Sequence, residues 1–152
     1  VTDVEARLGP IDVLVNSAGA ARRTPAEELD ATAWHAAMDA KFFSYIHVID
    51  VLVKRMALRE RGVIVSVLGS GGKVAGTQHV AGGAANAALM LATAGLGAAY
   101  APHGVRVVGV SPARVRSGKE QVYAETTYPT AWRAWRRGHW CAAGVSLRVY
   151  SR

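Results

Sequence analysis

The sequence predicts an α/β protein with a truncated, doubly wound parallel sheet of three strands and two long helices. Three apolar, β-branched runs at residues 11–16, 63–68 and 105–110 alternate with two long apolar segments at 31–59 and 80–100. Strands and helices that alternate with short connections favour right-handed crossovers and a parallel sheet. A loop of small residues follows each strand, at the edge where such sheets bind ligands.

The first strand, at residues 11–16, ends in the most informative loop of the chain. The residues that end this strand and begin the loop are Asn16, Ser17, Ala18 and Gly19. Only small residues let a backbone come close to a bound cofactor. We therefore assign this loop to a ligand-binding edge. The alternative is that Asn16 is a turn residue that satisfies local backbone groups.

A long helix is predicted over residues 31–59. Its apolar residues recur at three- and four-residue spacing, and the sequence at 24–28 has the cap, proline and acidic residues of a short helical turn. Gly62 is expected to end the helix after a basic last turn formed by Arg59 and Arg61. The second strand follows as a continuous β-branched run, which is typical of strands buried in a parallel sheet.

The second long helix, at residues 80–100, lies inside the longest uncharged stretch of the chain, residues 74–102. A stretch of this length invites a membrane interpretation. Its content is mostly alanine and glycine with polar residues such as Asn86, which makes it only weakly hydrophobic. We favour a helix buried on both sides in a globular fold and predict no membrane partner.

Length and composition fit one globular domain without a disulfide framework. The 152 residues are 51% hydrophobic and 19% charged, and Cys141 is the single cysteine. The polar, acidic N-terminus is unlike a signal peptide, so we expect a cytoplasmic protein. Because the sequence does not begin with methionine, we also expect it to start partway through a longer protein.

Residues 118–152 form a basic tail rich in tryptophan and arginine. Residues 1–117 carry twelve basic and nine acidic side chains, whereas the tail carries six and two, which gives it four of the seven net positive charges. An arm for nucleic acid or a membrane surface is one interpretation. We favour an unstructured or foreign end, read out of frame, because neither a nucleic-acid motif nor a strong period accompanies it. No nucleic-acid partner is therefore predicted.

Four segments, in order and spacing, resemble the short-chain dehydrogenase/reductase family over residues 1–117. They look like the family's fourth strand with its Asn-Asn-Ala-Gly motif, the strand leading to its catalytic serine, its Ser-Lys-Ala-Ala-Leu run, and its sixth strand with the Asn-Pro-Gly loop. These segments are residues 12–19, 62–67, 84–89 and 104–113. The resemblance implies a Rossmann-like domain, of which residues 1–117 are roughly the second half, followed by the atypical tail at 118–152.

The resemblance also implies a reaction, namely hydride transfer between NAD or NADP and a small carbonyl or alcohol substrate. In the family a tyrosine moves the proton, a lysine lowers the tyrosine pKa, a serine polarises the carbonyl and a helix asparagine anchors a water. The corresponding residues here are Gly82 for tyrosine, Asn86 for lysine, Gly69 for serine and Lys41 for asparagine. We therefore expect little or no activity by this mechanism.

Lys41, Tyr45 and Ser70 are the candidate substitutes for the catalytic residues. Lys41 and Tyr45 stand four apart on one helix and share a face, where a lysine would activate a tyrosine. The alternative is a core tyrosine beside a solvated lysine. Ser70, next to the vacant serine position, is a candidate donor to a carbonyl oxygen, or otherwise a plain loop residue between glycines.

The cofactor contacts implied by the resemblance are Asn16, Ala18, Gly19 and Pro112. We expect the site for NAD or NADP to be incomplete, because the sequence contains no Gly-x-x-x-Gly-x-Gly turn between a first strand and helix to hold the pyrophosphate.

The other titratable residues give weaker signals. His79 and Lys73 precede the second long helix, where a substrate would pass, although such residues are more often plain surface residues. No metal site is predicted, because the remaining candidates lack metal-ligand spacing with one another. These are His35, His47, His103 and Cys141.

Two function classes remain open. One is an NAD(P)-dependent oxidoreductase of this family, present here as a truncated or inactive member. The other is a non-catalytic interaction module that keeps the two long helices, whose equivalents form a four-helix dimer interface in the family. The resemblance thus implies a homo-oligomer built through residues 31–59 and 80–100.

Overall fold

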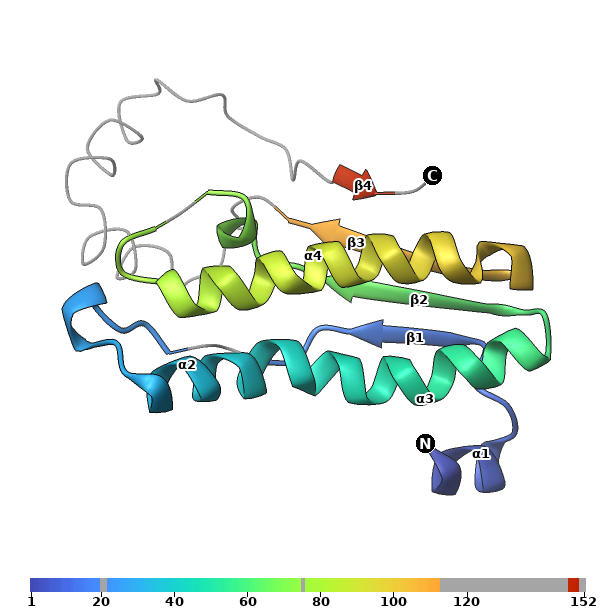
Figure 1. The fold of residues 1–152 in the computed structure, drawn as a ribbon. Coiled ribbons are helices and arrows are strands. Elements are labelled where there is room, and N and C mark those ends of the chain that lie inside the picture. The colour runs from blue at the N-terminus through green and yellow to red at the C-terminus, as the bar shows by residue number, and fades with distance from the viewer. Residues whose placement is uncertain (20–21, 75, 113–147, 151–152) are drawn as a thin grey trace, which may run out of the picture.

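The computed structural model describes residues 1–19, 22–74, 76–112 and 148–150, and it forms one mixed α/β unit (Figure 1). Three parallel strands and two long helical segments are present, as the sequence predicted. The helices are α1 (Thr2–Leu8), α2 (Ala31–Met38), α3 (Ser44–Leu58) and α4 (Val80–Tyr100), and the strands are β1 (Val13–Asn16), β2 (Gly62–Val67), β3 (Val105–Ser111) and β4 (Arg148–Tyr150). Short helical turns are η1 (Ala26–Glu28), η2 (Asp39–Phe43), η3 (Ser70–Gly72) and η4 (Ala101–His103).

The sheet has the strand order β1-β2-β3-β4. The first three strands are parallel, with Asn16 beside Ser66 and Ser66 beside Gly109. β4 pairs antiparallel with β3 and comes from the tail, where no sequence period predicted a strand. This short strand satisfies backbone groups along an edge of β3 that would otherwise be open. The expectations for residues 118–147 lie outside the described residues.

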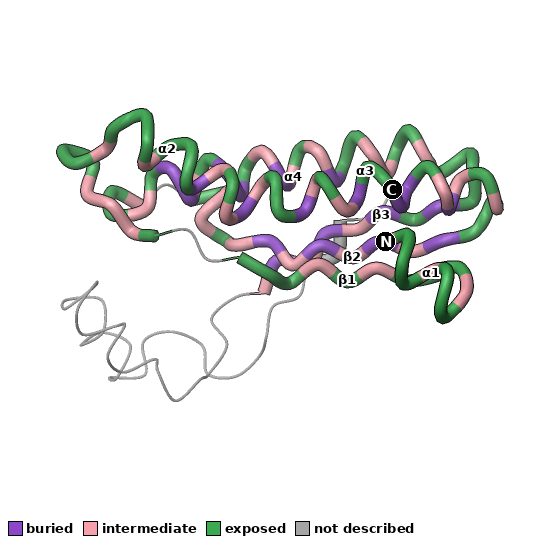
Figure 2. The backbone as a smooth tube through the Cα atoms, turned by 90° about the horizontal axis from the view of Figure 1, so that it is seen from below, coloured by how far each residue is buried: buried purple, intermediate pink, exposed green. Residues whose placement is uncertain are grey.

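Helices cover one face of the sheet. Figure 2 shows α2, α3 and α4 together on one side of the strands. Along β2 and β3 every second residue is buried, which gives these strands one face in the core. The core combines α3, α4 and that face of the sheet, through Tyr45, Ile49, Val53, Met56, Ile64, Leu68, Leu89, Val105 and Val107.

The predicted helix at 31–59 is three consecutive helical segments rather than one α-helix. Asp30 caps its start by accepting a hydrogen bond from the Ala33 N–H at 2.7 Å. The middle segment η2 is a π-helix. A π-helical turn changes the direction of the side chains that follow it and often occurs at functional sites.

Gly62 does not end that helix, so this expectation was wrong. α3 ends at Leu58, and Glu60 carries the left-handed backbone conformation with φ 52°. Gly62 instead begins β2, where a Cβ atom would lie 2.4 Å from the Met56 Sδ. The glycine is therefore needed because the core side chain of Met56 packs directly on the backbone.

α4 is buried on one side rather than on both. Its inward residues include Ala85, Asn86 and Leu89, whereas Leu91 is 77% exposed. By length and composition alone, Val80–His103 could span a membrane, and 33% of its most apolar window is buried. One such helix among the described residues is weak support for a membrane span, since a core helix of a soluble protein passes the same test.

Glu5 ties α1 to the end of α3. Its carboxylate binds Arg55 and lies 3.4 Å from an Arg59 guanidinium nitrogen. The Ile11 N–H donates to the same carboxylate at 3.3 Å, and Arg59 donates to the Ile11 carbonyl at 2.7 Å. The Arg55 hydrogen bond holds the pKa of Glu5 below its usual value, so the carboxylate stays ionised at neutral pH.

Replacing Glu5 by Gln should therefore loosen α1. The variant loses the charge that both arginines share, and amide hydrogen exchange in Thr2–Leu8 should become faster than in the parent. Asp50→Asn is the matched control, because the Lys54–Asp50 pair is exposed and such pairs contribute about 0–1 kcal/mol. Equal exchange rates in the parent and in Glu5→Gln would contradict this role.

Candidate functional site

Three strand ends meet at one edge of the sheet, as the alternating pattern predicted. β1, β2 and β3 run in the same direction, so the loops that follow them lie at the same edge (Figure 1). These loops begin at residues 17, 68 and 112. Ligands of open parallel sheets bind beyond this edge. The loop after β2 lies between the loops that follow β1 and β3.

Asn86 connects the three positions that the resemblance assigns to catalytic residues. The Gly69 N–H donates to Asn86 Oδ1 at 2.6 Å, and Asn86 Nδ2 donates to the Gly82 carbonyl at 2.8 Å. Asn86 is 5% exposed. Both ends of its amide are thus occupied by backbone, and the side chain holds the loop after β2 against α4.

Glycines allow η3 to approach α4 this closely. A Cβ on Gly69 would lie 2.8 Å from Asn86 Oδ1, and a Cβ on Gly72 would lie 2.7 Å from the Ala87 nitrogen. A Cβ on Gly83 would come within 2.9 Å of the Gly71 carbonyl oxygen. Real Cβ contacts are longer than this, so side chains at these positions would push the loop away. Ser70 is exposed at the start of η3.

Lys41 and Tyr45 come together next to this loop. Lys41 Nζ donates to the Tyr45 hydroxyl at 3.0 Å and to the Val67 carbonyl at 3.2 Å. The Tyr45 hydroxyl also donates to the Val67 carbonyl at 3.0 Å. Lys41 is 9% exposed and Tyr45 is fully buried. The alternative of a solvated lysine was therefore wrong, whereas the alternative of a core tyrosine fits the burial.

The expected cofactor residues lie at the end of β1 and in the loops after β1 and β3. Asn16 Nδ2 is buried and has no hydrogen-bond acceptor among the described residues, so a donor remains for a bound group. Gly19 has φ 88°, and a Cβ there would lie 2.0 Å from the Ala40 carbonyl oxygen. Its small size is thus required by packing against η2. Ala18 is exposed and Pro112 is half-buried.

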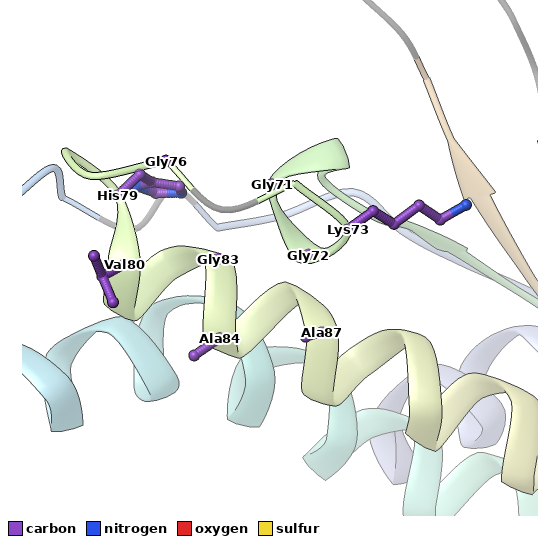
Figure 3. A pocket seen from close by; sticks show the side chains of 9 residues that line it. All are labelled: Gly71, Gly72, Lys73, Gly76, His79, Val80, Gly83, Ala84 and Ala87. Carbon is purple, nitrogen blue, oxygen red and sulfur yellow. The ribbon is translucent and has the colours of Figure 1, made fainter.

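A cavity of about 270 Å³ lies between η3 and the start of α4 (Figure 3). His79 and Lys73 both line it, and in Figure 3 the Lys73 side chain extends away from His79. The rest of the wall is backbone and small apolar side chains. The lining residues are Gly71, Gly72, Lys73, Gly76, His79, Val80, Gly83, Ala84 and Ala87.

The His79 ring packs against Gly82, which sequence reasoning did not anticipate. A Cβ on Gly82 would lie 2.1 Å from His79 Cε1, so the ring fills the place where a side chain of residue 82 would begin. Burial lowers the pKa of His79, and the positive charge of Arg23 lowers it further. One feature of the sequence could have indicated this contact. His79 immediately precedes α4 and Gly82 is the third residue of that helix, and the residue before a helix lies close to the third helical residue.

No group of three or more histidine, cysteine, aspartate or glutamate residues that could hold a metal ion occurs in the described part of the chain. Cys141 lies outside the described residues.

Similar proteins include dehydrogenases and reductases that are longer than this chain. D-threitol dehydrogenase from Mycolicibacterium smegmatis is 37% identical over 109 residues, which are 72% of this chain and 42% of that protein. The 5-keto-D-gluconate 5-reductase from Escherichia coli is 26% identical over 132 residues, covering 87% of this chain and 52% of the relative. The chain thus spans about half the length of the curated relatives it matches.

Solved structures give the same assignment. Gluconate 5-dehydrogenase from Burkholderia cenocepacia, in complex with NADP and tartrate, matches with a TM-score of 0.75 and 26% identity over 88% of this chain and 51% of its own. An NADPH-bound short chain oxidoreductase from Pseudomonas aeruginosa, described as containing an atypical catalytic center, matches with a TM-score of 0.73 and 30% identity over 90% of this chain and 54% of its own. The family description short chain dehydrogenase matches residues 1–127. The chain belongs to the short-chain dehydrogenase family.

Proposed function

We propose that this chain is the second half of an NAD(P)-dependent oxidoreductase and that it does not turn over by the tyrosine–lysine mechanism of its family. The observation that carries the proposal is the bridge that Asn86 makes between the Gly69 N–H and the Gly82 carbonyl. The bridge stands where the resemblance would put serine, tyrosine and lysine. The chain is in this sense a pseudoenzyme.

The chemistry at these positions supports the loss of turnover. Proton transfer to a carbonyl needs a group whose pKa suits the reaction, and a cationic neighbour is what lowers a phenol pKa. Gly82 supplies no acid, and the amide of Asn86 carries no charge. The amide is also held by two backbone groups, so it is not free to bind a ligand.

Lys41 and Tyr45 are assigned a positioning role rather than a catalytic one. The tyrosine hydroxyl is fully buried and donates to the Val67 carbonyl, so it has no proton to offer a substrate. The lysine binds the same carbonyl and the hydroxyl. The pair therefore anchors η2 to the end of β2. Ser70 offers an exposed hydroxyl at this edge that could donate to a carbonyl oxygen.

NADH or NADPH would supply a hydride to a carbonyl, the oxidised forms would accept one from an alcohol, and Asn16 is the residue here that fits such a group. Its buried amide donor lacks an acceptor among the described residues. Ala18 and Pro112 would lie near the cofactor, and Gly19 would shape the loop. A small carbonyl or alcohol is the substrate class, and a cytoplasmic location fits the composition. NADP is bound in the related gluconate 5-dehydrogenase structure.

The proposal is tested by measuring nucleotide binding and turnover on the same sample. Calorimetry with NADH and NADPH measures nucleotide binding. Absorbance assays with ketone and sugar-acid substrates should then show no turnover above the rate in buffer without protein. Asn16→Ala should weaken any nucleotide binding that is found. Steady oxidation of NADPH that depends on a carbonyl substrate would overturn the proposal.

Tyr45→Phe should destabilise the chain by about 1–3 kcal/mol, because Lys41 and the Val67 carbonyl each lose a buried hydrogen bond. Chemical denaturation measures the change. Tyr100→Phe is the matched control: Tyr100 is half-buried and its hydroxyl makes no hydrogen bond among the described residues, so its change should stay within about 0.5 kcal/mol. Equal losses in the two variants would contradict the anchor.

A second candidate function, a dimerisation module, is favoured by the outer surface of α3 and α4. α4 contains no charged residue, and a groove of about 410 Å³ runs between the two helices. Phe42, Ile46, Ile49, Asp50, Ala92, Gly95 and Leu96 line this groove. An apolar helix face of this kind is stabilised when a second apolar surface covers it. We infer a homodimer through these helices.

Gly95→Glu should convert the dimer to a monomer. No atom lies within 4 Å of a Cβ at Gly95, so the monomer should tolerate the side chain, whereas a carboxylate in a dimer interface lacks a partner. Ala94→Glu is the control, since Ala94 is exposed but does not line the groove. Light scattering distinguishes the states. A monomeric parent, or a dimer in both variants, would refute this interface.

A further inference from the structure

β1 is an edge strand, and its outer backbone groups have no partner among the described residues. It comes first in the order β1-β2-β3-β4 and pairs only with β2. The Val63 N–H donates to the Asp12 carbonyl at 2.9 Å, and every second residue of a strand directs its N–H and C=O groups to the same neighbour. Asp12 and Leu14 therefore face β2, whereas Val13 and Val15 direct their backbone groups to the free edge.

The side chains at this edge are apolar and exposed. Val13 and Val15 are 57% and 61% exposed, respectively, whereas Leu14 between them packs against the core. Because successive side chains of a strand alternate, the two valines lie on the face of the sheet that the helices leave uncovered (Figure 2). The edge thus offers two β-branched side chains and the unpaired N–H and C=O groups of both residues to another extended strand.

This edge is complementary to itself when two copies run antiparallel. In an antiparallel ladder, residues whose N–H and C=O groups point towards each other form hydrogen-bonded pairs. A two-fold axis at Leu14 places Val13 opposite Val15 of the second copy, and Val15 opposite Val13. All outer N–H and C=O groups of the valines are then paired, and β-branched side chains lie side by side across the two strands.

The neighbouring registers are less favourable. A two-fold axis one residue earlier would require the outer groups of Ile11, whose N–H already donates to Glu5 and whose carbonyl accepts from Arg59. An axis one residue later would require Ser17, which lies beyond the end of β1. The axis at Leu14 uses only backbone groups that lie within β1 and have no partner among the described residues.

We propose that β1 binds β1 of a second copy of this chain, antiparallel and with the two-fold axis at Leu14. The two sheets then form one continuous sheet, and a two-fold axis perpendicular to it keeps the helices of both copies on one face. This surface differs from the groove between α3 and α4, and the pairing does not rest on the proposed function.

Charge and size define the kind of contact. With the axis at Leu14, Asp12 lies opposite Asn16 of the second copy, so the two Asp12 carboxylates do not face each other across the strands. β1 has four residues, and a contact through it buries well below the about 800 Å² per partner of a standard interface. The association is therefore weak. It forms at high protein concentration and leaves a dilute Gly95→Glu chain monomeric.

Disulfide trapping tests the register. Val13→Cys and Val15→Cys are made separately in the full chain, each together with Cys141→Ser and with Gly95→Glu, which should remove the interface through the helices. Residues opposite each other in a hydrogen-bonded pair have Cα atoms about 5.5 Å apart, which a disulfide can bridge. Diagonal neighbours are about 7–8 Å apart, which is too far. An equal mixture of the two variants should therefore form a disulfide dimer on mild oxidation, whereas each variant alone should stay mainly monomeric.

Amide hydrogen exchange in the Gly95→Glu chain is the second measurement. The Val13 and Val15 amides should exchange more slowly as the protein concentration rises, because pairing protects them. The Leu14 amide faces β2 and should not change, which makes it the control within the same strand.

Two results would overturn the pairing, provided that amide spectra show folded chains. One is a dimer yield in the mixture that is no higher than in the single variants. The other is exchange of the Val13 and Val15 amides that does not depend on protein concentration. Both results are independent of the turnover assay.

Discussion

The candidate site is built around the close contact between the loop after β2 and α4. Asn86 makes this contact with both ends of its amide, while Gly69 and Gly72 remove the side chains that would keep the elements apart. Buried polar groups are stable when they are fully hydrogen-bonded, and this amide meets that condition with backbone alone. The same arrangement that stabilises the loop leaves neither a phenol nor an ammonium group at this point.

A second anchor acts just before Gly69 in the chain, at Val67 at the end of β2. The Val67 carbonyl accepts hydrogen bonds from both Lys41 and Tyr45, and η2 is thereby held against the strand. A lysine that is 9% exposed needs such partners because burial of an unpaired charge is costly. The two anchors act on residues 67 and 69, so the position of η3 depends on both long helical segments.

Much of the fold could be predicted because the spacing of apolar residues along the sequence indicates which side chains are buried. The continuous runs of β2 and β3 and the spacing on α3 each follow from which side chains face the core. Gly62 shows the limit of such reasoning, because its small size is required by Met56 from the preceding helix and not by a helix end. The one-sided burial of α4 could not be predicted either. Alanine and glycine occur on both its buried and its exposed faces, so the helix has no clear amphipathic pattern.

The site was less predictable than the fold because its key contacts join residues of different elements or depend on a side-chain direction. The vacancy at Gly82 follows from the resemblance, but the place of the His79 ring over it follows from the backbone at the start of α4. The Lys41–Tyr45 pair was accessible from spacing, whereas its shared acceptor on β2 was not.

The open surfaces of the described chain indicate what its stability requires. Val13 and Val15 on β1 are 57% and 61% exposed, and the other edge of β1 has no strand beside it in the described residues. An exposed edge strand with apolar side chains tends to pair with another chain. α4 adds an uncharged outer face on a different side of the unit. Covering α4 by a second copy would bury one surface but would leave β1 open, so dimerisation through the helices and protection of β1 are separate requirements.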